Sequence, residues 1–208
     1  MVVVVMVIVG VCHEPNLAQA GALCHYRSMA VPAAMSKLAD GIDRLTRAVG
    51  RAAAWLVVAV VLLQFALVVA RYAFALGSMK LTEAVIYGHA ALILGAAAWT
   101  LAAGGHVRVD IFYGQAGARA RAAIDLAGSL LLLLPFMLLL LSLSVPYAER
   151  SWAIWERSQD VGGLPLVFLL KTMIPAFAAL MALQGVAQAI RAAAVLSNRA
   201  QPMNRELR

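Results

Sequence analysis

The chain has 208 residues, of which 63% are hydrophobic and 13% are charged, with a formal net charge of +7. Soluble domains carry about 45–50% apolar and about 25% charged residues, so this composition excludes an ordinary soluble domain. The positive charge does not indicate nucleic-acid binding, because the Lys and Arg residues stand at the ends of apolar runs and not in one basic patch with aromatic side chains.

Residues 1–34 differ in pattern from the rest of the chain. The apolar run over residues 1–11 is too short to span a membrane and lacks the basic start of a signal peptide. Regular patterning begins only after Met35, so we expect an over-extended gene start with Met35 or Met29 as the initiator. A short membrane-surface anchor is the alternative. Both cysteines lie in this segment, so the sequence predicts no disulfide and no thiolate metal site in residues 35–208.

Residues 36–51 have the pattern of one helical stripe. Leu38, Ile42, Leu45 and Val49 recur at spacings of four, three and four residues, with basic side chains on the other faces. This pattern predicts a short N-terminal amphipathic helix that lies in the membrane interface. A solvated helical lead-in to the first span is the alternative.

Four apolar runs are long enough to cross a bilayer core, which takes roughly 20 residues per helix. They predict spans at about 52–74, 82–104, 126–148 and 164–190. The expected fold class is therefore an all-α integral membrane protein, with residues 35–208 forming one four-helix unit. Twelve of the 17 Lys and Arg residues flank the termini and the loop between spans two and three. The positive-inside rule places these parts, and hence both termini, in the cytoplasm.

Local signals refine the ends and bends of these spans. Ser78 or Thr82 is expected to cap the second span, with Glu83 in its first turn, where a carboxylate suits the helix dipole. Pro165 is expected in the first turn of the fourth span, where its missing N–H costs least. Pro135 and Pro175 lie inside spans and predict kinks.

The sequence predicts no catalytic residue, no cofactor and no metal site. It has no Ser/His/Asp arrangement, HExxH pair or Walker loop, and Gly162-Gly163 lacks the strand and the Lys-Ser/Thr of a phosphate loop. His89 and His106 are separated by roughly 25 Å along a helix and cannot share one haem. A contact between helices is the most plausible role for His89, as an ionisable group inside a span.

The stretch from Gly105 to Tyr113 gathers a His, an Arg and an Asp between two apolar runs. If it is helical, His106 and Asp110 share a face and can pair. If it is extended, Val107, Val109 and Ile111 alternate with Arg108, Asp110 and Phe112. One interpretation is a membrane-surface turn. The other is a fixed charged contact, through Arg108 and Asp110, with a second protein at the cytoplasmic face.

Several short motifs together resemble the small membrane subunit of TRAP (tripartite ATP-independent periplasmic) transporters, over residues 35–194. They are Arg71-Tyr72-Ala73-Phe74, Glu83, Gly105-His106-Val107-Arg108-Val109-Asp110, Gly162-Gly163-Leu164-Pro165, Lys171, Ile174-Pro175 and Leu183-Gln184-Gly185. The resemblance implies family-motif residues for subunit contact or topology, namely Arg71, Glu83, Gly105, His106, Arg108, Asp110, Gly162, Gly163, Pro165, Lys171 and Pro175.

The resemblance also implies a function. Such subunits are multi-pass proteins of the bacterial inner membrane that brace a large multi-span permease. That permease binds substrate and sodium, and a soluble periplasmic protein delivers the substrate, mostly organic acids. The alternatives are a free-standing four-helix transporter or a membrane redox subunit. The nearly uncharged spans argue against the first, because a charged solute needs a polar path.

Overall fold

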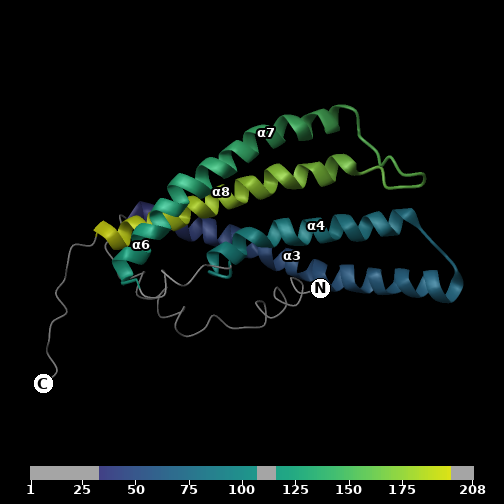
Figure 1. The fold of residues 1–208 in the computed structure, drawn as a ribbon, viewed down its shortest axis with the longest axis horizontal. Helices are drawn as coiled ribbons and strands as arrows, with labels where there is room; N and C mark the ends of the chain where they lie inside the picture. Colours follow the sequence, from purple (N-terminus) through teal and green to yellow (C-terminus); the bar gives the residue numbers. More distant parts are fainter. Residues whose placement is uncertain (1–32, 107–115, 198–208) are drawn as a thin grey trace, which may run out of the picture.

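A computed structural model describes residues 33–106 and 116–197, and all the regular structure in these residues is helical (Figure 1). Four stretches are long and apolar enough to cross a membrane. They are α3 (Ala33–Phe74), α4 (Met79–Ala102), the run Ala118–Ala153, and α8 (Val167–Ser197). The third consists of α6 (Ala118–Ala127), the π-helical segment η1 (Gly128–Leu133) and α7 (Leu134–Ala153). The predicted class, an all-α membrane protein with four spans, is confirmed.

The first helix is longer than predicted. Residues 36–51 do not form a separate helix but are the first part of α3, which runs without interruption for 42 residues. The sequence contains no proline there, and the alanines after Arg51 favour helix, so nothing ends the helix before the apolar run. At 1.5 Å per residue α3 is about 63 Å long, roughly twice the thickness of a bilayer core.

The helix α8 is the central element of the fold. The four long helices lie side by side, and α8 contacts α3, α4, α6 and α7 (Figure 1). Its buried positions are mostly small, including Ala178, Gly185 and Ala187. At Gly185 a Cβ atom would lie 2.9 Å from Leu133 Cδ2, so glycine allows α8 to approach the π-helical segment closely. Small residues on α8 therefore determine how near its neighbours come.

The helices α3 and α4 pack as an antiparallel pair through small residues. Ala53, Val57, Leu92 and Ala96 form its buried core. Gly50 fits against Trp99, where a Cβ atom would lie only 2.6 Å from that of the tryptophan. The glycine thus allows the indole to lie against the backbone of α3.

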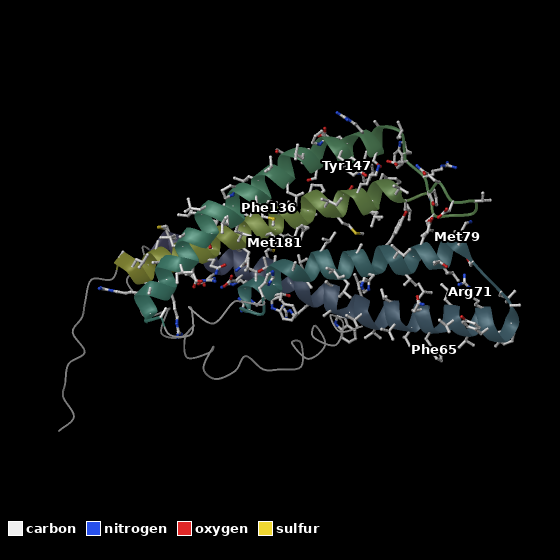
Figure 2. All side chains as sticks on the ribbon, in the orientation of Figure 1. Phe65, Arg71, Met79, Phe136, Tyr147 and Met181 are labelled. Atoms are coloured by element: carbon white, nitrogen blue, oxygen red, sulfur yellow. The ribbon has the colours of Figure 1, made fainter. Side chains whose placement is uncertain are left out.

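The outer faces of the row of helices are strongly apolar. On α3 the exposed side chains include Trp55, Leu62 and Phe65, and Figure 2 shows Phe65 pointing away from the other helices. Exposed leucines and Phe136 continue this surface on the third span. A soluble protein rarely exposes so much contiguous apolar surface, so these faces fit lipid or another membrane protein.

Two details at the helix ends differ from the sequence prediction, namely the turn that holds Glu83 and the place of Pro165. Ser78 is the N-cap of α4, as expected, but the helix begins at Met79, which puts Glu83 in the second turn and not the first. Pro165 precedes α8 and does not lie in its first turn; the carbonyl of Leu166 accepts the first backbone hydrogen bonds instead. Pro135 is the second residue of α7, which begins where the π-helical segment ends. The kinks at Pro135 and Pro175 stay predictions.

Candidate functional site: polar clusters at the two ends of the helices

A buried carboxylate on α4 holds the loop between α7 and α8. Glu83 on α4 is only 7% exposed, so its carboxylate needs hydrogen-bond donors from the protein. One carboxylate oxygen accepts a hydrogen bond from the Ser158 hydroxyl, and the other accepts one from the backbone N–H of Leu164 at 2.5 Å. We refer to Glu83, Ser158, Gly163 and Leu164 as the Glu83 cluster. It joins the second span to the hairpin that connects the third and fourth.

The loop conformation in this cluster requires glycine. Gly162 has a φ of +80°, in the left-handed region that glycine adopts without steric cost. At Gly163 an added Cβ would lie 2.5 Å from the Ser158 side chain and 2.7 Å from Glu83 Oε1. The Gly163 N–H also donates to the Asp160 carbonyl at 3.0 Å, which closes the turn. The two glycines therefore allow the loop to pack against the Glu83 carboxylate.

A second polar group lies at the same end of the molecule, between α7 and α8. Lys171 of α8 donates to Glu156 at 2.5 Å and lies 4.3 Å from the centre of the ring of Tyr147 on α7. Figure 2 labels Tyr147 on α7, beside α8. Its hydrogen bond lowers the pKa of the Glu156 carboxyl below the usual range. Nearby, the Trp152 indole donates to the Thr172 hydroxyl at 2.8 Å. The loop between α7 and α8 thus has polar contacts both with Glu83 of α4 and with Lys171 of α8.

The opposite end of the molecule has a cluster of its own between α3 and α8. The amide of Gln184, 1% exposed, donates to Asp43 at 3.1 Å and accepts from the Thr46 hydroxyl at 3.2 Å. The other Asp43 oxygen forms an ion pair with Arg191. We refer to Asp43, Thr46, Gln184 and Arg191 as the Gln184 cluster. An apolar contact of Ala39 and Ile42 with Ala187 lies beside it.

Comparison with known proteins gives one result. A family model described as "Tripartite ATP-independent periplasmic transporters, DctQ component" matches residues 60–195. The chain belongs to the DctQ family. The matched range includes α4, the third span and nearly all of α8, and therefore the whole Glu83 cluster. No curated protein and no solved structure matches the chain.

Membership of this family confirms the resemblance seen in the motifs and makes the protein a component of a TRAP transporter. The structure brings three of the predicted residues of this DctQ component together, namely Glu83, Gly162 and Gly163. Pro165 lies two residues after Gly163, and Lys171 lies one helical turn into α8. Whether these residues contact another subunit stays a prediction.

The remaining predicted residues are dispersed. Arg71 is exposed in the last turn of α3, near the turn into α4 (Figure 2), and Pro175 lies inside α8. The Gly105 N–H donates to the Thr100 carbonyl at 2.9 Å, and His106 is exposed just beyond α4. Arg108 and Asp110 lie outside the described residues, so the alternatives for their segment stay open.

The sequence analysis missed Ser158 and most of the Gln184 cluster. Asp43 and Arg191 pair across 148 positions of the chain, and such pairing leaves no local pattern in the sequence. One signal was present: Gln184 is a strongly polar amide inside an apolar run, where such groups are hydrogen-bonded to neighbouring helices. That signal indicates a partner but does not identify it.

Within residues 33–106 and 116–197, no three His, Cys, Asp or Glu residues gather in a way that would hold a metal ion. His89 is half-buried on α4, and its role at a contact between helices stays a prediction. The contacts of the Glu83 and Gln184 clusters connect helices to one another and to the loop before α8.

We expect Gly163→Ala to destabilise the DctQ component by about 1–3 kcal/mol, because the methyl group displaces the loop and leaves the Glu83 carboxylate without its donors. The measurement is reversible unfolding of the purified protein in detergent. Gly77→Ala is the matched control, since a Cβ there meets nothing within 4 Å. Equal stability of the two variants would contradict this role of the cluster.

Asp43→Ala should also destabilise the protein by about 1–3 kcal/mol, because Arg191 and Gln184 both lose an acceptor in a poorly hydrated place. Asp40→Ala, which removes an exposed carboxylate from the same helix, should stay within about 0.5 kcal/mol of the wild type. The same unfolding assay serves for both. Similar losses in the two variants would mean that net charge, and not the cluster, matters.

The Glu156–Lys171 pair predicts a dependence of stability on pH. Because the pKa of Glu156 is lowered in the folded state, its contribution is complete above the unfolded carboxyl pKa of about 4.3 and is lost as the pH falls through the folded value. We expect the wild type to be more stable than Glu156→Gln at pH 6, with the difference disappearing towards pH 3. Glu149→Gln, at an exposed site, should show no such convergence.

Proposed function

We propose that this DctQ component is the small membrane subunit that braces the large permease of a TRAP transporter in a bacterial inner membrane. The transporter would use an ion gradient, in our proposal sodium, to take up organic acids delivered by a periplasmic binding protein. The family match over residues 60–195 is the observation that carries this proposal. Both termini and the loop between α4 and α6 are proposed to face the cytoplasm, as the distribution of Lys and Arg predicts.

The polar groups of the described spans support a bracing role over transport by this chain alone. The hydroxyls of Ser142, Ser144 and Thr172 bond to carbonyls of their own helices. Glu83 and Gln184 are taken up by contacts between helices and loop. These groups are therefore not arranged to replace the water around a moving solute, as a transport path requires.

The shape of the molecule supports the same role. The helices lie side by side, with α8 in contact with each neighbour, and polar clusters hold the row at both ends (Figure 1). Broad apolar faces remain on the outside. A stiff element with such faces can fix a moving membrane partner in the bilayer.

The test is uptake by the reconstituted system. Proteoliposomes that contain the large permease and this chain should take up substrate when the binding protein and a sodium gradient are present. This chain alone should show no uptake, and the large permease alone should show little. Uptake at an undiminished rate without this chain would contradict the proposal, and uptake by this chain alone would favour a free-standing transporter.

A variant separates bracing from substrate handling. In the complete system, Asp43→Ala should lower kcat and leave KM for the delivered substrate unchanged, because the Gln184 cluster stiffens the row of helices and touches no substrate in this proposal. Asp40→Ala again serves as the control. A changed KM with an unchanged kcat would point to a role in substrate binding instead.

A further inference from the structure

Three exposed arginines of α3 lie close to a tryptophan of α4. Among the described residues, Arg44, Arg47, Arg51 and Trp99 line one surface pocket. At 100° per residue, the spacings of three and seven residues keep the arginines within about 60° of one another on α3. They extend over about 10 Å of the helix axis. We refer to these four residues as the arginine pocket.

The tryptophan in this pocket is fixed by packing. Trp99 is half-buried, and its Cβ and ring atoms lie against the backbone of Gly50, between Arg47 and Arg51 in the sequence. A bulkier residue at position 50 would push the indole away. The pocket therefore combines cations from one helix with an ordered amphipathic ring from its neighbour.

The charges of the pocket are available to a ligand. The structure gives Arg44 and Arg51 no ion pair in residues 33–106 and 116–197, and Arg47 donates through Nε to the Asp43 carbonyl at 3.0 Å, which leaves its terminal nitrogens for a ligand. Asp40 lies on the same face, one turn before Arg44, and reduces the potential at that outer end. The Asp43 carboxylate is already paired with Arg191. The net charge of the side chains beside Trp99 is therefore positive.

The position of the pocket along α3 matches the headgroup level of a membrane. Arg51 is the last charged residue before the uncharged run Ala52–Ala70. Tryptophan is enriched at the same level, where its ring meets acyl chains and its N–H meets headgroups. The guanidinium group binds phosphate oxygens through two parallel hydrogen bonds.

We propose that the arginine pocket binds the phosphate of an anionic phospholipid, with Trp99 against its glycerol and upper acyl region. An acidic surface of a partner protein would satisfy the arginines equally, but it would not explain their place at the boundary of the apolar run beside an indole. The proposal does not rest on the bracing function, because lipid binding is a property of this chain alone.

The test compares two triple variants of the full-length protein in nanodiscs of equal phosphatidylglycerol and phosphatidylcholine. One carries Arg44→Gln, Arg47→Gln and Arg51→Gln. The control carries Lys80→Gln, Arg150→Gln and Arg157→Gln, which removes three exposed charges at the other end of the helices. Lipids retained after release into the gas phase are identified by native mass spectrometry.

We expect the ratio of retained phosphatidylglycerol to phosphatidylcholine to fall about tenfold in the first variant and to stay at the wild-type value in the control. Equal ratios in both variants would overturn the proposal. So would a first variant that retains its lipid but no longer co-purifies with the large permease, because the pocket would then be a protein contact. Competition by soluble glycerol phosphate at the same concentration as lipid would also overturn it, as that indicates a general anion site.

A milder substitution covers the case in which the Gln variant does not fold. Replacing the three arginines by lysine retains the charge and removes the paired hydrogen bonds to phosphate. We expect this variant to fold and to retain less phosphatidylglycerol than the wild type, but more than the Gln variant where that one folds. If the lysine variant retained phosphatidylglycerol and phosphatidylcholine in the same ratio as the Gln variant, the result would contradict an electrostatic site.

Discussion

The fold depends on a constraint set by its apolar surroundings. A polar side chain buried between the helices needs a hydrogen-bond partner from the protein, because little water is present there to provide one. Gln184 illustrates it. The amide is 1% exposed near the middle of α8, and it is satisfied only because Asp43 and Thr46 of α3 meet it. Because both partners lie in the first part of α3, this contact also explains why α3 continues past the bilayer length: the extra turns are packed against α8 by polar and apolar contacts together.

The same constraint operates at the other end through a different device. Glu83 would be costly to bury alone, and the structure provides donors from a loop and not from a helix face. A loop can bring a backbone N–H to a carboxylate, which a helix interior cannot, because its N–H groups are already bonded. With Glu83 at one end and Gln184 at the other, the helices are fixed relative to one another, and the sides of the row remain apolar. This division of polar ends and apolar sides suits the proposed bracing role.

The places where sequence reasoning failed share a cause. The separate interfacial helix was inferred from the change between an amphipathic and an apolar pattern, but a change in environment does not end a helix when no breaker is present. Glu83 was assigned to the dipole of α4, because a first-turn carboxylate is the local explanation, whereas its actual partners lie 75 and 81 residues away. The Gly162-Gly163 pair was recognised as a motif. Its physical reasons, the left-handed φ of Gly162 and the space that Ser158 and Glu83 need at Gly163, became evident only from the fold.

The sequence by itself determined the class of the protein, the number of spans and the family, because these depend on the length and composition of apolar runs and on short motifs read along the chain. The tertiary structure decided which helices are neighbours, the central place of α8, and the pairing of Asp43 with Arg191 and of Glu83 with the α7–α8 loop. The physical reason is the sequence distance over which each kind of interaction acts. Hydropathy and helix signals act within a few turns, whereas hydrogen bonds between distant segments depend on how small residues let whole helices approach.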